Sequence, residues 1–147
     1  MKSSYSQLMQ THYFHPAFNS AIYDGPLRLY FAQFHESLAL KIYFLAQQKL
    51  GPLMNRAKEV SRKTGATVLV LIYPSVEFFD QTFAKAKHPN SRLAVDQFEQ
   101  DLLFGVRGPF EDEELEGFLN VLENEVKAWV ETHESAREFS IGLESSL

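Results

Sequence analysis

The sequence predicts a helix-rich α+β domain in which about five helices surround a small sheet centred on a strand at residues 66–73. The strand is indicated by the run VLVLIY, which is typical of a strand buried on both faces. The helices are indicated by apolar residues that recur every three or four positions. Hydrophobic residues make up 45 % of the 147 residues and charged residues 22 %, an ordinary balance for a globular domain. We therefore expect residues 1–147 to form a single domain with flexible ends at 1–16 and 144–147.

The apolar stretch at residues 27–50 is predicted to form one helix over 26–50. Asp-Gly-Pro at 24–26 suits the start of a helix, and Gly-Pro at 51–52 suits its end. Six apolar residues fall on a single stripe at helical spacing; they are Leu27, Phe31, Phe34, Leu38, Ile42 and Leu45. Further apolar residues lie off this stripe, so the helix is expected to be central in the fold or covered by a partner. These are Leu29, Tyr30, Leu40, Tyr43 and Phe44.

The alternative for this stretch is a hairpin at 27–46, with strands at 27–34 and 38–46, which would give a larger antiparallel sheet. Its turn, at residues 35–37, contains none of the Gly, Pro, Asn or Asp residues that favour turns. Ile42 is its only β-branched residue, although strands favour such residues. The helix is therefore preferred, and the hairpin stays open as the alternative.

A second helix is predicted at residues 52–64, with Pro52 in its first turn and Gly65 at its end. Its inner face is expected to hold Leu53, Ala57, Val60 and Thr64, and its outer face Arg56, Lys58, Arg62 and Lys63. The strand that follows needs partners, for which the candidates are residues 18–24 and 137–143. If neither segment is a strand, another chain must complete the sheet.

Three further helices are predicted at residues 76–87, 91–104 and 111–133, with Ser75 and Ser91 as the N-caps of the first two. The helix at 111–133 has acidic residues in its first turns, which favour the positive N-terminal end of a helix. Its apolar residues line one face; they are Leu115, Phe118, Leu119, Leu122, Val126, Trp129 and Val130, followed by His133.

The net charge of −5 is unevenly distributed along the chain. Residues 1–40 are neutral, residues 41–92 have nine basic and three acidic groups, and residues 93–147 have three basic and fourteen acidic groups. Two explanations follow from this asymmetry. The basic and acidic segments face each other within one fold or a dimer, or the basic segment meets an anionic partner.

Residues 53–72, LMNRAKEVSRKTGATVLVLI, resemble part of a MADS-box, in which a helix reading roughly IMKKAYELS is followed by a turn with Gly and an apolar strand. The matching positions are Met54, Ala57, Glu59, Ser61, Thr64, Gly65, Val68, Leu69 and Leu71. That family grips DNA with a basic arm and a basic helix start, whereas the matching stretch here, FLAQQKLGP, has Lys49 as its only charge. The resemblance covers about 20 residues, and we interpret it as local structural convergence. It implies nucleic-acid binding as an alternative function, with phosphate contacts from Arg56, Lys58, Arg62 and Lys63.

The carboxyl end of the strand at 66–73 is the predicted place for a ligand, because ligands gather there in α/β sheets. The residues at this end are Tyr73, Ser75 and Glu77, with His35 as a further candidate. No nucleotide-binding, nucleophile or metal-binding motif is present, and the lack of cysteine excludes thiol chemistry. We therefore predict no catalytic residue, no metal site and no cofactor.

The favoured function is that of a non-catalytic interaction or regulatory protein of the cytoplasm, acting through protein–protein contacts as a homodimer or with another protein. One alternative is a small-molecule-binding domain or enzyme with a pocket at the C-terminal end of strand 66–73. A second alternative is nucleic-acid binding through the basic helix at 52–64. No membrane span is expected, because Arg28, Glu36 and Lys41 interrupt the most apolar stretch.

Overall fold

The computed structural model describes residues 8–24, 26–74, 76–83, 93–107 and 112–145. Its centre is a mixed sheet of five strands in the order β1-β2-β3-β5-β4. The strands are β1 (Ser20–Asp24), β2 (Leu27–Phe31), β3 (Val68–Tyr73), β4 (Leu93–Phe98) and β5 (Asp101–Arg107). The three inner strands run parallel, while β1 and β4 pair antiparallel at the two edges.

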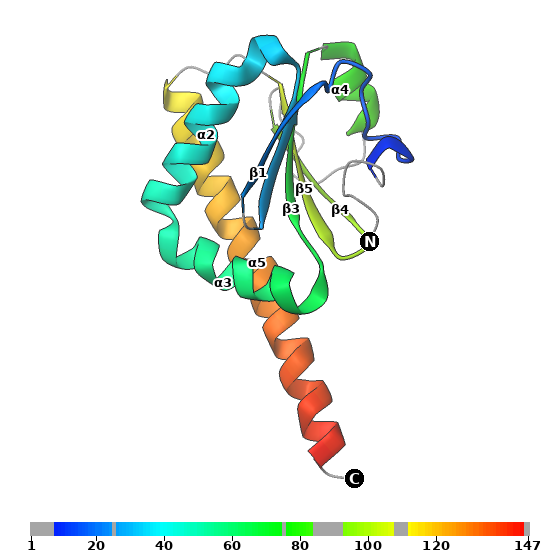
Figure 1. Ribbon diagram of the computed structural model, residues 1–147, viewed down its shortest axis with the longest axis vertical. Helices are drawn as coiled ribbons and strands as arrows, with labels where there is room; N and C mark the ends of the chain where they lie inside the picture. The colour runs from blue at the N-terminus through cyan, green and yellow to red at the C-terminus, as the bar shows by residue number, and fades with distance from the viewer. Residues whose placement is uncertain (1–7, 25, 75, 84–92, 108–111, 146–147) are drawn as a thin grey trace.

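The helices lie in two layers on either side of the sheet. They are the short 3₁₀-helix η1 (Gln33–His35) and the α-helices α2 (Glu36–Lys49), α3 (Gly51–Thr64), α4 (Val76–Thr82) and α5 (Asp112–Ser145). Figure 1 shows α2, α3 and α5 together on one side, which we call the helix face, and α4 with the N-terminal segment on the other, the opposite face. The last turns of α5 extend beyond the rest of the molecule (Figure 1).

Each face of the sheet has its own apolar core, because successive residues of a strand point to opposite sides. On the helix face, β2 contributes Leu27, Leu29 and Phe31 to a cluster that also contains Ile42 of α2 and Leu122 of α5. On the opposite face, the cluster is rich in rings and includes residues of the N-terminal segment; the buried rings are Tyr13, Phe18, Tyr30, Tyr73, Phe79 and Phe83. The inner strands are therefore apolar on both sides.

Several sequence predictions are confirmed. The run at 66–73 contains β3, all six residues of which are buried. The segment 18–24 contains the strand β1, but β1 pairs with β2 and not, as predicted, with β3. The helix predicted at 52–64 is α3; it has Pro52 in its first turn and ends at Gly65, which adopts a left-handed φ of 78°. The predicted face of the last helix is also buried, from Leu115 to Val130.

The helix predicted over 26–50 is wrong in its first third. Residues 27–31 form β2, and α2 begins only at Glu36. The hairpin alternative is right about a strand at the start but wrong about 38–46, which is helical. The physical reason is that β2 lies between β1 and β3 and is buried on both faces. Apart from Arg28, β2 is apolar, so its residues also satisfy a helical spacing.

The helix predicted at 91–104 is also wrong, because this region forms the β4–β5 hairpin. The chain reverses at Glu99, which adopts a left-handed φ of 55°. Glycine is the residue that usually adopts this conformation in a turn, so the sequence gives no signal for the hairpin here. The strand proposed at 137–143 is wrong as well, since α5 continues through it to Ser145. β3 instead finds its parallel partners in β2 and β5.

The α+β class is thus confirmed, with four α-helices in the described residues and a sheet larger than predicted. The helix expected at 76–87 is α4, which is described as far as Thr82; residues 84–87 lie outside the described residues, as do the proposed caps Ser75 and Ser91. Within the predicted flexible N-terminus, Leu8 and Tyr13 are buried. Residues 1–7 and 146–147 lie outside the described part, so the flexible ends stay a prediction.

Candidate interaction surfaces

The structure describes three of the four residues predicted to bind a ligand near the end of β3, and each has a different environment. Tyr73 is fully buried, and its hydroxyl donates a 2.6 Å hydrogen bond to the carbonyl oxygen of Tyr13. Burial raises the pKa of Tyr73 far above its ordinary value, so the hydroxyl stays protonated. Glu77 is exposed on α4, and Ser75 lies outside the described residues. The structure therefore gives Tyr73 a role in packing.

His35 lies in η1, after the end of β2, and its ring is half-buried beside Phe34 at a centroid distance of 4.4 Å. Burial lowers the pKa of His35 below its ordinary value. Its Nδ1 atom is buried and has no hydrogen-bond partner among the described residues. Tyr73 belongs to the core of the opposite face, whereas His35 lies in η1 after β2.

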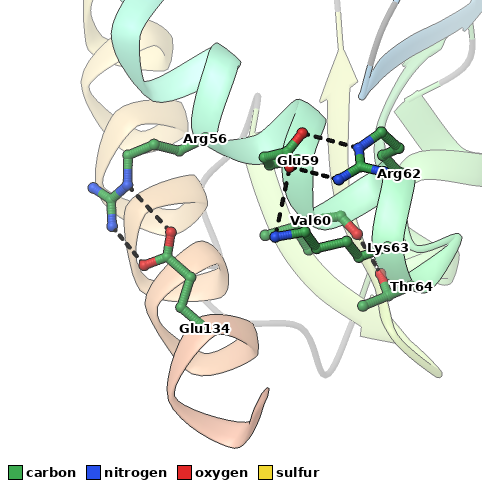
Figure 2. Close-up of polar contacts among 7 residues, drawn as sticks. All are labelled: Arg56, Glu59, Val60, Arg62, Lys63, Thr64 and Glu134. Carbon is green, nitrogen blue, oxygen red and sulfur yellow. Dashed lines mark hydrogen bonds and ion pairs between the residues drawn. The ribbon is translucent and has the colours of Figure 1, made fainter. Parts of the chain in front are cut away.

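The four basic residues predicted to contact an anionic partner lie on the exposed side of α3. Three of them are engaged in ion pairs, drawn in Figure 2: Arg56 with Glu134 of α5 at 3.0 Å, and both Arg62 and Lys63 with Glu59, at 2.8 and 3.5 Å. The hydrogen bond from Arg62 lowers the pKa of Glu59 to about 2. Positive and negative charges therefore alternate along this surface.

Ion pairs also join the basic and acidic segments of the chain. Arg56 reaches Glu134 from α3 to α5, and Lys41 of α2 donates to Asp112 at the start of α5 at 2.9 Å. Glu134 raises the pKa of Arg56, and Lys41 lowers the pKa of Asp112. Both pairs support the explanation in which the two segments face each other within the fold.

A groove of about 500 Å³ lies between the end of α3 and the middle of α5. Its lining combines carboxylates, an ammonium group and an imidazole; the residues are Glu59, Val60, Lys63, Thr64, His133 and Glu134. The hydroxyl of Thr64 donates to the carbonyl oxygen of Val60, as Figure 2 shows, and His133 packs edge-on against Trp129 at 4.9 Å. Glu59 and Glu134 already have cationic partners, so the groove carries a mixed lining without a dominant charge.

The most exposed apolar residues of α2 and η1 form a patch on the outside of the helix face. Phe34 is 72 % exposed, Phe44 62 % and Leu40 37 %, and we call these three residues the α2 patch. Leu40 and Phe44 are one helical turn apart, on the side of α2 that points away from the buried residues Ala39, Ile42 and Ala46. The patch therefore belongs to the side of α2 that the rest of the described fold does not cover.

The sequence predicts part of this surface. Leu40 and Phe44 are apolar residues that lie off the predicted stripe, whereas Phe34 belongs to the stripe and is predicted to face the core. Phe34 is exposed because the chain leaves β2 at Phe31 and enters α2 at Glu36, which breaks the assumed helical phase. Glu134 was not identified, since its partner Arg56 is 78 positions away in sequence.

Two further observations limit the chemistry of the described residues. Among them, no group of three or more histidine and acidic side chains is placed to hold a metal ion. Nor does any helix, over the residues that could be searched, have the length and apolar character needed to cross a membrane. Comparison with protein-family models, with curated proteins and with solved structures finds no match to this chain.

Proposed function

We propose that this chain is a non-catalytic interaction domain that acts through protein–protein contacts and self-associates as a homodimer through the α2 patch. The observation that carries the proposal is the exposure of Phe34, Leu40 and Phe44, three large apolar side chains in the consecutive elements η1 and α2. A regulatory role in the cytoplasm belongs to the same proposal, as expected from a chain without cysteine.

Burying these side chains gives a driving force for association. An aromatic or aliphatic side chain contributes roughly 1.5–3 kcal/mol when it passes from full exposure to full burial. Aromatic residues are also enriched at the centres of protein interfaces, where polar residues form the rim. The α2 patch has this arrangement, because Ser37, Lys41 and Gln48 surround its apolar residues on the same exposed side.

The two alternative functions draw less support from the geometry. Phosphate contacts by α3 would compete with the carboxylates of Glu59 and Glu134, which already engage three of the four predicted cations. A pocket at the end of β3 would have to displace Tyr73, which is fully buried and hydrogen-bonded. Nucleic-acid binding and a pocket at this end of the sheet therefore rank below protein binding.

The test is the oligomeric state measured by light scattering and sedimentation over a wide concentration series. We expect a dimer for the wild type and a monomer for the double variant Phe34→Ser/Phe44→Ser. The matched control is Asn120→Ser/Asn124→Ser, which changes two exposed polar residues one turn apart on α5 and should remain dimeric. Circular dichroism establishes that all three proteins are folded. A wild type that stays monomeric throughout, or a serine variant that dimerises as the wild type does, contradicts the proposal.

The groove between α3 and α5 supports a second candidate function, the binding of a small polar molecule. Its volume of about 500 Å³ lies in the range of small-molecule sites. A panel of charged and zwitterionic metabolites should contain a compound that raises the melting temperature. His133→Ala should abolish this shift, whereas Glu131→Ala, an exposed change on the same helix, should preserve it. If no compound stabilises the wild type, this second function is rejected.

A further inference from the structure

β1 is an edge strand that is paired on one side only. It forms an antiparallel ladder with β2, and no other strand of the described residues lies beside it. A strand at a sheet edge presents unpaired backbone N–H and C=O groups, which can form the same ladder with a strand from another chain. The open edge of β1 is therefore a place where the sheet can be extended.

The two edges of the sheet differ in this respect. At the other edge, Asp96 of β4 accepts a 2.6 Å hydrogen bond from the hydroxyl of Tyr13, so the N-terminal segment is tied to that strand. β1 reads Ser-Ala-Ile-Tyr-Asp, and it contains neither the lysine nor the proline with which proteins often protect an edge. Extension is therefore favoured at β1.

Aromatic and apolar side chains lie beside this edge on both faces of the sheet. On the helix face, Ile22 and Tyr43 of α2 are both partly buried and pack against the core cluster. On the opposite face, Tyr23 is 53 % exposed and lies edge-on to Tyr30 at a centroid distance of 5.8 Å. An added strand would cover apolar surface on both sides while it completes the backbone ladder.

A hydrogen bond links the start of β1 to η1, which carries part of the α2 patch. Lys41 points toward α5, because it pairs with Asp112, so Leu40 and Tyr43 lie on the flank of α2 away from α5. The start of β1 is tied to η1, which carries Phe34, because the side-chain oxygen of Asn19 accepts a 3.0 Å hydrogen bond from the backbone N–H of Gln33. The edge and the patch can therefore be buried in one interface.

We infer that β1 pairs antiparallel with β1 of a second copy of this chain, so that the two five-stranded sheets become one continuous sheet across a homodimer. The α2 patches of the two copies then lie on the same side of this sheet, next to the joined strands. This inference rests on the proposed homodimer and specifies its geometry.

A second copy is the partner that the strand itself favours, because β1 is complementary to itself. A two-fold axis at Ile22 places Ala21 opposite Tyr23 of the second copy, a small side chain beside a large ring. The same axis places Ser20 opposite Asp24 of the second copy, so that the two acidic residues of the pair do not face each other. No residue of the strand meets a like charge in this register.

The sequence contains no cysteine, so single cysteines can test the register directly. Opposed residues of an antiparallel pair have Cα atoms roughly 4.5–5.5 Å apart, within the range that a disulfide spans. We expect Ile22→Cys to form a disulfide-linked dimer under mild oxidation at low protein concentration. The matched control is Asn120→Cys, at an exposed position of α5, which should stay unlinked.

A mixing experiment sharpens the test. Ala21→Cys and Tyr23→Cys should each cross-link poorly alone but efficiently when mixed, because residue 21 of one copy then faces residue 23 of the other. Residues two positions out of register are too far apart for a disulfide. The variant Phe34→Ser/Phe44→Ser in the Ile22→Cys background should lose the cross-link.

The outcomes separate this inference from the proposed function. If the wild type is a dimer but neither Ile22→Cys nor the mixed pair cross-links, strand pairing is overturned and self-association through the α2 patch stands. If Asn120→Cys cross-links as efficiently as Ile22→Cys, the bond reports random collision and strand pairing is again overturned. If the wild type is monomeric, both proposals fail. If the edge of β1 instead accepts an extended peptide from another protein, strand pairing between two copies is overturned.

Discussion

The two faces of the sheet are held by different kinds of structure. The helix face is covered by α2, α3 and α5, which contribute mainly aliphatic side chains at repeated helical positions. The opposite face is covered by the short α4 and by an irregular N-terminal segment, which contribute rings and hydrogen bonds. The comparison shows that the helices are positioned mainly by apolar packing at repeated positions, whereas the irregular segment depends more on specific hydrogen bonds.

These polar contacts come from two tyrosines on the opposite face. The hydroxyl of Tyr13 donates to Asp96 of β4, and the hydroxyl of Tyr73 donates to the carbonyl oxygen of Tyr13. Tyr13 takes part in both hydrogen bonds, as the donor in the first and through its carbonyl oxygen in the second. Together they hold the N-terminal segment over the sheet. On the helix face, the corresponding side-chain bond is made by Trp129, whose Nε1 donates to the carbonyl oxygen of Gln100.

The largest expected effect lies on the helix face. Leu122 is fully buried between α5 and the sheet, so Leu122→Ala should leave a cavity and lower the free energy of unfolding by about 2–5 kcal/mol. Urea unfolding followed by circular dichroism measures this change. The control is Glu123→Ala, at the next and exposed position, which should have little effect. A small effect of Leu122→Ala would mean that α5 does not pack on the sheet as described.

The opposite face should be most sensitive at Gly105. A methyl group at this position would overlap the ring of Phe83, which is itself buried. Gly105→Ala should therefore lower the free energy of unfolding by about 1–3 kcal/mol, the usual cost of overpacking. Gly117→Ala is the control, because its Cβ meets open space on α5, and it should stabilise the protein by about 0.5–1 kcal/mol.

The smaller side chain of Phe83→Leu should partly relieve the effect of Gly105→Ala. In a double-mutant cycle, the two changes together should therefore cost less than the sum of the two single changes. Strict additivity would show that residue 105 and Phe83 are not in contact, and it would remove the packing explanation for this glycine.

The sequence predicts the helix face better than the opposite face, for a physical reason. The ends of α3 are predicted by Pro52 and Gly65, and the buried face of α5 by its repeated apolar positions. The face of α3 is predicted only in part, because Ala57 and Val60 are buried while Thr64 is exposed. The strand β2 is not predicted, because a strand that is buried on both sides lacks the alternation of apolar and polar residues that indicates a strand. The β4–β5 turn is not predicted either, because it depends on Glu99 adopting a left-handed conformation that other residue types adopt more easily.

The candidate surfaces show the same division between local and long-range information. The pairing of Glu59 with Arg62 can be read from their spacing of three residues on a helix. The pairing of Arg56 with Glu134 depends on how α3 packs on α5, which no local pattern contains. In the same way, the exposure of Phe34 follows from the change from strand to helix, and the open edge of β1 follows from the strand order.

A moderate effect is expected for the polar contacts of the opposite face. Tyr13→Phe keeps the ring but removes its hydrogen bond to Asp96, and should lower the free energy of unfolding by about 1–2 kcal/mol. Hydrogen exchange should show that residues 8–18 become less protected while α5 is unchanged. Equal loss of protection in both regions would indicate that the two faces are not separately stabilised.

The smallest expected effect is a pH dependence centred on His15. Its Nδ1 accepts a 2.9 Å hydrogen bond from the backbone N–H of Ala17, and its ring packs edge-on against Phe78 at 4.6 Å. Burial lowers the pKa of His15 in the folded protein below its ordinary value. As the pH falls, the unfolded chain therefore binds the proton first, and the stability present above about pH 6.5 decreases below it.

His15→Asn should flatten this dependence, because asparagine retains an acceptor for the Ala17 N–H but does not titrate. The melting temperature of the wild type should fall more than that of His15→Asn between about pH 8 and about pH 5.5. His35→Asn is the comparison in η1, where burial also lowers the histidine pKa. Low pH should also loosen residues 8–18 in the wild type but not in His15→Asn. Parallel melting curves for the wild type and His15→Asn would exclude His15 as the titrating group.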